Sequence, residues 1–524
     1  MTEAILLRGS GLTIDEVVRI ARRREKAALD EPTRMRIQAG REVVERLAAD
    51  LEHQVYGINT GFGSLKDVVI DAEHLATLQR NLLMSHAAGM GDPLPVEIVR
   101  AAMALRANAL AKGASGVRPV VVETLISMLN RGVHPYIPAQ GSVGASGDLA
   151  PLSHLALVIS RPADEALDDP QLSGEVLDET GGRGPGKAAM EQAGIERLVL
   201  GAKEGLALNN GVQISTAIAL LALVDGERLA RLADLACAMT LEGVRGVPEA
   251  FMAEVHRYRP FAGQIASAAA VARYIAGSSL AGSDSSRVQD GYSIRCAPQV
   301  HGAVRDTLVH VRRVLEVEIN SATDNPLIVE IDGGQKTISA GQFHGEPIAL
   351  AADAMKTALS ELASISERRI FRLLTRALSF GLPPLLVPPD RPGLGLMTLQ
   401  FTAAGLVAEN KHVAHPSSVD NVPTCEDQED HVSMSPISAR GARRIAQNTT
   451  YVLAAELLCA AHALAMRRKQ GPCRMGAGVQ RGFELCRRAL ELDSAGAAPS
   501  VCLEQIHDQI QNGEFDALVS EAPQ

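Results

Sequence analysis

The stretch GSVGASGDLAPLSHLAL, from Gly141 to Leu157, places one serine among very small residues. A serine hydrolase carries G-x-S-x-G around its nucleophile, but here the frame is G-A-S-G, so the second glycine comes one residue too early. A glycine after Ser146 leaves the Gly147 nitrogen uncrowded and tolerates unusual backbone angles. In a sharply bent backbone, that nitrogen can attack the Ala145 carbonyl and close a five-membered ring with loss of water.

A second water can then be lost from Ser146. The product carries an exocyclic methylene group conjugated with the ring carbonyl, which is a strong electrophile made without a bound cofactor. The helix expected to begin around Asp148 would direct its positive end toward this group. The same residues also suit an ordinary Gly/Ser turn before a helix, and A-S-G alone favours that interpretation. Motifs elsewhere in the chain are needed to decide between a self-cyclising turn and an ordinary turn.

The composition disfavours several classes of function. The 524 residues include 51 Lys and Arg against 61 Asp and Glu, for a formal net charge of −10. This acidic balance, with 3% aromatic residues and no Trp, disfavours binding to nucleic acid or to anionic membranes. Seven widely spaced cysteines without a C-x-x-C motif predict free thiols. Because neither a signal peptide nor a membrane-spanning apolar run is evident, we expect a cytoplasmic protein.

Apolar residues recur with the helical period over much of the chain. Examples are residues 12–28, where Thr13 and Glu16 have the spacing of a capping box, residues 95–113 and residues 346–374. Many of the periodic residues are alanines, which favour close packing between helices. The strand–helix alternation of a parallel sheet is not evident. The sequence therefore predicts a mainly α fold built as a long helical bundle.

A polar, glycine-rich stretch from residue 161 to residue 193 interrupts the helical pattern. It is typical of a surface excursion between two helical parts. We therefore expect a domain boundary near Gly205. The predicted domains are an N-terminal domain over residues 1–204, which carries the serine turn, and a helical-bundle domain over residues 205–524.

The longer context of the serine closely resembles the signature of the aromatic amino-acid ammonia-lyases, a family of histidine, phenylalanine and tyrosine lyases and related aminomutases. The resemblance extends from about Leu51 to about Asn448. It includes, in order, YGINTGFG, LQRNLLMSHAAGMGDPL, KEGLALNNG, QDGYSIRCAPQVHGA, NSATDNPLIV, GQFHGEPIALAAD, AENKHVAHPSSVD and QEDHVSM. In that family the A-S-G triad cyclises to methylidene-imidazolone (MIO). The resemblance thus implies that Ala145, Ser146 and Gly147 form MIO, with no external cofactor.

The same resemblance implies an architecture and an assembly. The expected fold is the fumarase/aspartase-like helical bundle, with a smaller N-terminal part that carries the MIO loop. The family is typically a homotetramer whose active sites are assembled from three chains. The expected partner is a small amino-acid substrate. His412 and His415 share a helical spacing, but two histidines without a third ligand make a poor metal site, so we interpret them as structural and expect no metal.

Three residues have catalytic or substrate-binding roles by resemblance. Tyr56, in YGINTGFG, would remove the proton from the substrate β-carbon, which a phenol can do when an electropositive site lowers its pKa. Arg295, in GYSIRC, would grip the substrate carboxylate with its planar guanidinium. Tyr292 would face the same pocket. By themselves, a loop tyrosine is usually only packed and an arginine usually forms a surface ion pair.

Three further residues match substrate-site positions. Asn210, in LALNNG, resembles the family asparagine near the MIO ring and the substrate carboxylate. Gln289 resembles a substrate-site glutamine, and Phe343, in GQFHGEP, resembles an aromatic wall of the pocket, although a lone phenylalanine is usually core. Asn209, which precedes Asn210, usually has an apolar counterpart and departs from the family pattern.

Two positions predict the substrate by resemblance. The position of His86, in MSHAAG, tends to be apolar in phenylalanine lyases, whereas tyrosine and histidine enzymes have histidine there. The position of Glu429, in QEDH, tends to be glutamine in the tyrosine and phenylalanine enzymes and is glutamate in histidine lyases. Together they predict histidine, because imidazole needs polar partners at its nitrogens. Alternatively, Glu429 belongs to a solvated acidic face or a weak cation site. That acidic run comprises Glu426, Asp427, Glu429 and Asp430, and its first two members depart from the family pattern.

Three functions remain open at this point. The first is the deamination of histidine to urocanate and ammonia. The second keeps the MIO chemistry but uses tyrosine or phenylalanine, as a lyase or as an aminomutase that re-adds ammonia at the β-carbon. The third is a catalytically silent helical scaffold that has kept the fold. The mass of the intact chain distinguishes the third from the others, because MIO formation removes two waters.

Overall fold

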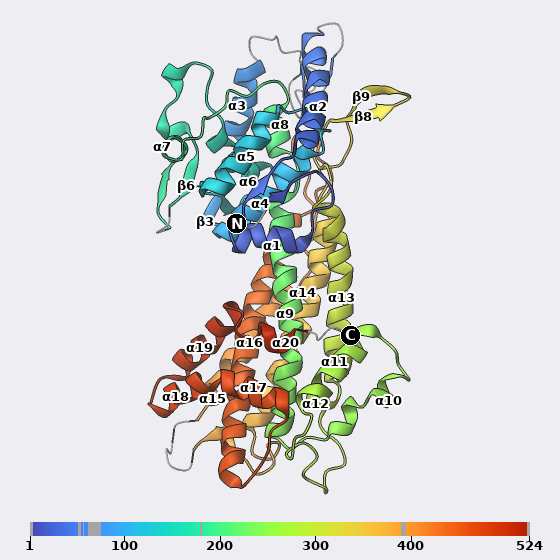
Figure 1. Cartoon of the computed structure of the whole chain (residues 1–524), viewed down its shortest axis with the longest axis vertical. Coiled ribbons are helices and arrows are strands. Elements are labelled where there is room, and N and C mark those ends of the chain that lie inside the picture. The colour runs from blue at the N-terminus through green and yellow to red at the C-terminus, as the bar shows by residue number, and fades with distance from the viewer. Residues whose placement is uncertain are drawn as a thin grey trace. The chain divides into compact units, whose positions relative to one another are not determined.

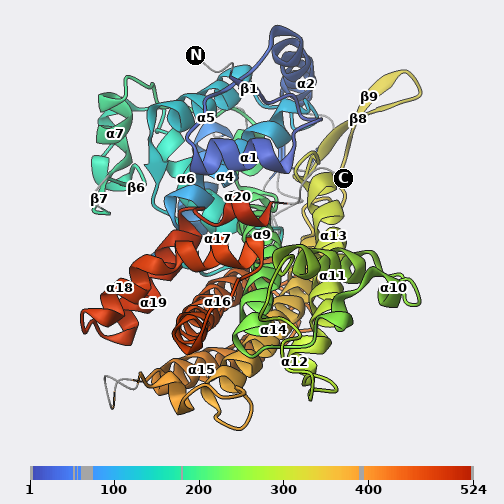
Figure 2. The ribbon, with the colours of Figure 1, turned by 60° about the horizontal axis from the view of Figure 1, so that its bottom comes forward.

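The computed structural model describes residues 4–50, 54–55, 57–60, 75–178, 181–388, 393 and 395–520. Helices dominate these residues, which confirms the predicted fold class (Figures 1 and 2). The chain forms two compact units. Unit 1 comprises Met1–Leu221, Arg312–Ala352 and Pro416–Arg440, and unit 2 comprises Ala222–Val311, Asp353–His415 and Gly441–Gln524. The boundary expected near Gly205 lies within unit 1, and the division into domains 1–204 and 205–524 stays a prediction.

Unit 1 combines helices with short strands. Its helices are α1 (Ile14–Arg22), α2 (Glu31–Ala49), α3 (Leu75–His86), α4 (Val96–Ala111), α5 (Pro119–Arg131), α6 (Leu149–Ile159), α7 (Gly186–Gln192) and α8 (Glu204–Asn209), with the 3-10 turns η2 (Glu165–Leu167) and η3 (Pro170–Leu172). Strands β1 (Ile5–Leu6) and β2 (Ala27–Ala28) pair in parallel. The antiparallel sets are β3 (Met90–Pro93) with β5 (Pro138–Gln140), β4 (His134–Pro135) with β6 (Glu175–Leu177) and β7 (Arg183–Pro185), and β8 (Leu327–Ile331) with β9 (Gly334–Ile338).

Unit 2 is built from helices. Its shorter helices are α10 (Ala253–His256), α11 (Ala262–Tyr274), α12 (Tyr292–Arg295), α15 (Met397–Val413), α17 (Ala477–Leu485), α18 (Arg487–Ser494), α19 (Pro499–Gln511) and α20 (Asp516–Val519), with the 3-10 turns η4 (Pro248–Phe251) and η5 (Pro384–Leu386). Four longer helices have residues in both units: α9 (Gln213–Gly243), α13 (Ala297–Glu318), α14 (Glu346–Leu374) and α16 (Ser435–Gln470). Helix α14 coincides with the predicted stretch 346–374.

Two predicted helices differ in detail from the expectation. The capping box at the start of α1 is confirmed, because Glu16 N donates to Thr13 Oγ1 and Thr13 N donates to Glu16 Oε2. However, α1 ends at Arg22, since Arg24 takes a left-handed φ of 54° and the chain continues into β2. Helix α4 is buried around nearly its whole circumference, so it is a core helix and not the one-faced amphipathic helix that the sequence suggests.

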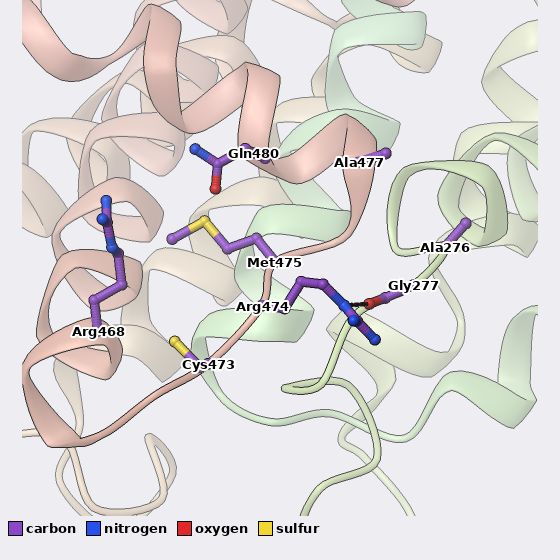
Figure 3. A pocket seen from close by; sticks show the side chains of 8 residues that line it. All are labelled: Ala276, Gly277, Arg468, Cys473, Arg474, Met475, Ala477 and Gln480. Carbon is purple, nitrogen blue, oxygen red and sulfur yellow. Dashed lines mark hydrogen bonds between the residues drawn. The ribbon is translucent and has the colours of Figure 1, made fainter.

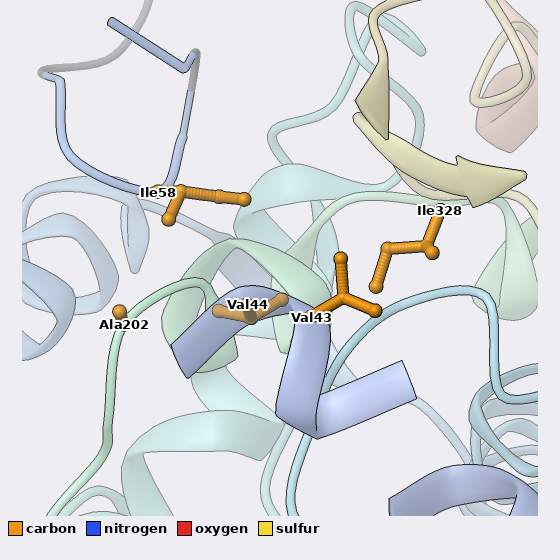
Figure 4. Close-up of a cluster of buried hydrophobic side chains, with 5 residues drawn as sticks. All are labelled: Val43, Val44, Ile58, Ala202 and Ile328. Atoms are coloured by element: carbon orange, nitrogen blue, oxygen red, sulfur yellow. The ribbon is translucent and has the colours of Figure 1, made fainter. Parts of the chain in front are cut away.

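A small hydrophobic cluster joins distant segments of unit 1 (Figure 4). It contains Val43 and Val44 of α2, Ile58, Ala202 before α8, and Ile328 of β8. Full burial of an aliphatic side chain of this size contributes about 1.5–3 kcal/mol relative to exposure. The cluster therefore ties the N-terminal helices to a hairpin nearly three hundred residues further along the chain.

Helices α3, α6 and α8 pack against one another in unit 1. Helix α3 ends at His86, α6 begins directly after Asp148, and α8 ends directly before Asn210. Asn209, the departure noted above, is buried at the end of α8, and its Nδ2 donates to Ser153 Oγ of α6 at 3.1 Å. A polar residue is thus accommodated here because it links the two helices.

Helix α16 is long and apolar enough to cross a membrane by length and composition. However, 83% of its most apolar window is buried inside the protein. This burial is the pattern of a core helix, because a spanning helix presents its apolar side chains to lipid.

Candidate active site

The serine turn is bent as sharply as its sequence suggests. Ser146 and Gly147 both have positive φ, of 50° and 83°, and Gly147 N donates to Gly144 O at 3.2 Å. A non-glycine residue in this region costs on the order of 1–3 kcal/mol, so the surrounding structure must hold Ser146 in place. A Cβ on Gly147 would lie 2.3 Å from Gly211 O, which makes glycine necessary there.

Neighbouring backbone clamps the turn on both sides. Asp148 N donates to Gly211 O at 2.6 Å, and Met434 N donates to Val143 O at 2.9 Å. A Cβ on Gly144 would lie 2.3 Å from Ser433 Oγ, so the segment around Ser433 leaves room only for glycine. Two segments that are distant in sequence, around Gly211 and around Ser433, thus hold the turn on both sides.

Two predicted site residues contact Ser146 directly. Asn210 Nδ2 donates to Ser146 O at 2.6 Å, and Ser146 Oγ donates to Glu429 Oε1 at 2.8 Å. Glu429 is oriented by Thr424, whose Oγ1 donates to Glu429 Oε2 at 2.7 Å and whose backbone pairs with that of Glu429. The structure therefore brings Ala145, Ser146 and Gly147 together with Asn210 and Glu429.

The acidic run around Glu429 is not a uniform solvated face. Cys425, Glu426 and Asp427 all have positive φ, so the chain reverses direction between Thr424 and Glu429. Glu426 and Asp427 are exposed on this reversal, whereas Glu429 is half-buried and faces Ser146. The two departures from the family pattern thus lie on the exposed side of the loop.

A fully buried arginine supports the turn and was not singled out from the sequence. Arg106 of α4 donates through Nη2 to Asn210 O and through Nη1 to Gln213 Oε1 at 2.8 Å. Burial lowers the pKa of Arg106 to about 10. This value is still well above neutral pH, so the guanidinium stays charged. Gln213 Nε2 donates in turn to Thr323 Oγ1 at 2.7 Å. Arg106 therefore fixes the backbone from which Asn210 reaches Ser146.

Two carboxyls, those of the buried Asp148 and the half-buried Glu318, lie in this part of unit 1. Ser215 donates to Asp148 through N at 2.8 Å and through Oγ at 2.6 Å. Burial raises the pKa of Asp148 to about 6, although these hydrogen bonds oppose the shift. Burial, with a smaller contribution from the charge of Asp148, raises the pKa of Glu318 to about 7. Both groups therefore resist ionisation near the serine turn.

The Glu318→Gln variant is expected to raise the thermal midpoint at about pH 8 and to leave it nearly unchanged at about pH 4. A glutamate in an unfolded chain ionises near pH 4.3, whereas the pKa of Glu318 in the folded protein is about 7. Between these values the folded state binds more protons, so the stability of the wild type falls as pH rises. The exposed Glu316→Gln on the same helix is the control, and equal shifts at both pH values would contradict the prediction.

His86 ends α3 and is half-buried. Its Nδ1 lies 2.8 Å from Leu82 O, an acceptor, so Nδ1 carries the proton and Nε2 of the neutral ring is an acceptor. Among the hydrogen bonds of the described residues, none joins His86 to Ser146 or Glu429. The structure thus places His86 in the same unit as the serine turn and defines its tautomer.

Phe343 precedes α14 and is half-buried. Two residues later, a Cβ on Gly345 would lie 2.4 Å from Ser435 Oγ, so this segment runs close to the one that clamps the turn. Phe343 is therefore held near the segment that follows Glu429.

Three potential metal ligands also meet in unit 1. Ligand atoms of His344, Glu346 and His431 lie within 4.8 Å of one another. However, Glu346 N donates to His344 Nδ1 at 3.3 Å, so His344 Nε2 carries the proton and donates to His431 Nδ1 at 3.3 Å. The two histidines thus hydrogen-bond to each other in this structure.

Three predicted substrate-site residues lie in unit 2. Gln289 and Tyr292 are exposed, and Tyr292 retains 71% of its accessible surface. The Arg295 guanidinium lies 4.7 Å from the centre of the Tyr292 ring, and Arg295 Nε donates to Asp290 O at 2.9 Å. This bond holds the guanidinium in place and leaves its two terminal nitrogens for a carboxylate. Tyr56, the expected base, lies outside the described residues.

Buried ion pairs support helix α12, and sequence inspection missed them. Arg369 contacts Glu456 through Nε at 2.6 Å and Nη2 at 2.8 Å, and both side chains are fully buried. Arg369 Nη1 also donates to Ser293 O at 3.2 Å, within α12. Asp290 accepts from Val247 N at 2.6 Å and pairs with Arg287. These contacts fix the backbone that carries Tyr292 and Arg295.

A separate pocket of about 420 Å³ lies in unit 2 (Figure 3). Its lining includes Arg468, Cys473 and Arg474, and Arg474 Nε donates to Gly277 O at 2.7 Å. None of the site residues predicted from the sequence lines it, so we do not include this pocket in the candidate active site.

Known proteins resemble this chain over nearly its whole length. A family model described as aromatic amino acid lyase matches residues 12–488. A histidine ammonia-lyase of Caldanaerobacter subterraneus subsp. tengcongensis is 46% identical and covers 99% of this chain and 98% of its own length. A histidine ammonia-lyase of Bacillus subtilis is 48% identical over 88% of each chain.

Solved structures share the fold. A tyrosine aminomutase from Streptomyces globisporus superposes with a TM-score of 0.89 at 36% identity, covering 99% of this chain and 98% of its own. A histidine ammonia-lyase from Trypanosoma cruzi superposes with a TM-score of 0.87 at 36% identity, covering 99% and 95%. The same fold thus carries both lyase and aminomutase names.

Proposed function

The chain belongs to the aromatic amino acid lyase family, and from that premise we propose that it is a histidine ammonia-lyase that converts L-histidine to trans-urocanate and ammonia. The observation that carries the proposal is the position of Glu429, 2.8 Å from Ser146 Oγ. By family resemblance, glutamate at this position is typical of histidine lyases, whereas their tyrosine and phenylalanine relatives have glutamine. In this chain Glu429 directly contacts the turn expected to hold the electrophile. The 44–50% identity to proteins named histidine ammonia-lyase supports the same substrate.

Ala145, Ser146 and Gly147 are the residues that would form MIO in this enzyme, and the geometry of their turn fits that role. The positive φ values of Ser146 and Gly147 bend the backbone, and Gly211 excludes any side chain at position 147. Once formed, MIO supplies an electrophilic methylene group that activates the amino-acid substrate for loss of ammonia. Asn210, which already holds Ser146 O, would orient the carbonyl conjugated with that group.

Arg295 is proposed to bind the substrate carboxylate. Its Nε is held by Asp290 O, so the paired terminal nitrogens are available for a bidentate, charge-assisted contact. Tyr292 and Gln289 are proposed to line the same substrate site, and Tyr56 is proposed to remove the β-proton. These roles come from the family resemblance, and the support here is the fixed, adjacent placement of Arg295 and Tyr292.

His86 and Glu429 are proposed to recognise the imidazole ring, beside an aromatic wall from Phe343. His86 Nε2 and the Glu429 carboxylate are both acceptors, so either can accept the one N–H of a neutral imidazole ring. A phenyl ring has no N–H to donate to either of them. A polar group that loses its hydrogen-bond partner when the substrate covers it costs about 1–3 kcal/mol, or roughly 5- to 150-fold in binding or rate.

Histidine is therefore expected to be the preferred substrate, with a kcat/KM at least about 100-fold above those for tyrosine and phenylalanine. The measurement is the ultraviolet absorbance of the conjugated acid formed from each amino acid separately. His86→Leu should lower kcat/KM for histidine roughly 5- to 150-fold, because one polar partner is lost. Met84→Leu, an exposed change on the same helix, is the control.

Two results would contradict this assignment. Faster turnover of tyrosine or phenylalanine than of histidine by the wild type would exclude histidine as the main substrate. Accumulation of a β-amino acid, detected by chromatography of the products, would identify an aminomutase. Neither outcome depends on the folding of a variant.

A cytoplasmic homotetramer with shared active sites is also proposed. The family resemblance supports the assembly. The exposure of Tyr292 and Gln289 in the single chain is consistent with a site that neighbouring subunits complete.

A further inference from the structure

Ser146 must lose the second water, and both of its oxygens, the backbone O and the side-chain Oγ, are hydrogen-bonded. Asn210 Nδ2 lies 2.6 Å from Ser146 O, and Glu429 Oε1 lies 2.8 Å from Ser146 Oγ. Asn210 is 2% exposed, and its backbone is held by the buried Arg106. Thr424 fixes the other oxygen of Glu429. These contacts exist around the unmodified serine, before any substrate is present.

We propose that Glu429 is the proton donor that completes the self-processing of Ser146, in addition to its role toward the substrate. This inference rests on the proposed MIO function, because it concerns how that group is made. It gives Glu429 a task that is finished once per chain, before the first turnover. Asn210 has the complementary task of stabilising charge on Ser146 O.

The step can be written with every atom accounted for. After Gly147 N has bonded to the Ala145 carbonyl carbon and the first water has left, the Ser146 Cα–H bond breaks. Its electrons first extend onto Ser146 O, where the Asn210 amide stabilises the negative charge, and then form the Cα=Cβ bond. The Cβ–Oγ bond breaks with its electrons on Oγ. For this step Glu429 carries a proton on Oε1, so the 2.8 Å contact, in which Ser146 Oγ otherwise donates to Oε1, runs in the opposite direction. Oγ keeps its own proton, takes that of Glu429 and leaves as water. The Cα proton passes to solvent, which reprotonates Glu429.

Other carboxyls near the turn are less suited to this step. Asp148 directs its two oxygens to Ser215 N and Oγ. Glu426 and Asp427 are exposed on the loop reversal. Among the acids of the described residues, Glu429 is the one that hydrogen-bonds to Ser146 Oγ.

The test measures processing directly rather than activity. Three purified proteins are digested: the wild type, Glu429→Gln and Glu426→Gln. The mass of the peptide that contains residues 145–147 is then measured by mass spectrometry. The wild type and Glu426→Gln should lack two waters. Glu429→Gln keeps the shape but cannot donate a proton, so its peptide should lack one water only. Loss of a general acid slows a step roughly 100- to 10,000-fold, so the doubly dehydrated peptide should appear correspondingly slowly.

Thermal unfolding of the three proteins shows whether each variant is folded. Glu429→Ala is a second variant, expected to stop at the same stage because it also lacks the acid. Loss of both waters from Glu429→Gln at the wild-type rate would overturn the inference. Loss of no water from a folded Glu429→Gln would also overturn it, because Glu429 would then act before ring closure. A wild type that retains both waters would remove the MIO proposal itself, so the two failures are distinguishable.

Discussion

Turnover is expected to fall to background when Ser146 is replaced by alanine, while the chain still folds. Alanine has no Oγ to leave, so the exocyclic methylene cannot form. The fold should tolerate the change, because the hydrogen bond lost to Glu429 has a net value of about 0.5–1.5 kcal/mol. Histidine deamination and the near-ultraviolet absorbance of the modified group are the measurements.

Ser127→Ala on α5 is the matched control for this experiment. It removes the same hydroxyl from a half-buried serine elsewhere in the chain, and its turnover should equal that of the wild type. Wild-type activity in a verified Ser146→Ala protein would exclude MIO chemistry at this turn. The function would then have to be sought among the alternatives, including a scaffold without catalysis.

The largest loss of stability is expected for Glu456→Ala. Arg369 and Glu456 are both fully buried, and Thr240 and Ser366 also donate to the carboxylate of Glu456. Removing one partner leaves the Arg369 charge buried without compensation, so the free energy of unfolding should fall by about 3–5 kcal/mol. Urea denaturation followed by circular dichroism measures this change.

An exposed ion pair in the same unit provides the comparison. Glu409 and Arg444 lie 3.1 Å apart with side chains 53% and 60% exposed, so Glu409→Ala should change stability by about 0–1 kcal/mol. If Glu456→Ala is no more destabilising than Glu409→Ala, the buried pair does not have the role assigned here. Because Arg369 also holds Ser293 O, a weaker hold on substrate should accompany the loss of stability.

Much of the fold was predictable because its signals are local. The capping box at Thr13 and Glu16 and the apolar period over 346–374 are read from neighbouring residues. The placement of Asn210 near the serine turn was anticipated through family resemblance, since no local pattern connects residues so far apart. The contact of Glu429 with Ser146 was not anticipated.

The remaining features depend on contacts between distant segments. In RANALAKG, Arg106 has the appearance of an ordinary surface residue of an amphipathic helix, yet it is fully buried because Asn210 O and Gln213 receive its donors. The Arg369–Glu456 pair likewise has no sequence signature. The tautomer of His86 depends on the direction of one carbonyl group at the end of α3. Such details follow from tertiary packing, which periodicity does not encode.

The hydrogen bond between Ser146 and Glu429 spans 283 residues of sequence. During translation, at typical rates, that separation corresponds to roughly 15–60 s. A nascent or truncated chain that ends before residue 429 therefore holds an ordinary serine, and on the inference above it cannot complete the electrophile. If Glu429 completes the electrophile, a group that would react with cellular thiols and amines arises only in a chain that has been synthesised and folded far enough to contain that residue.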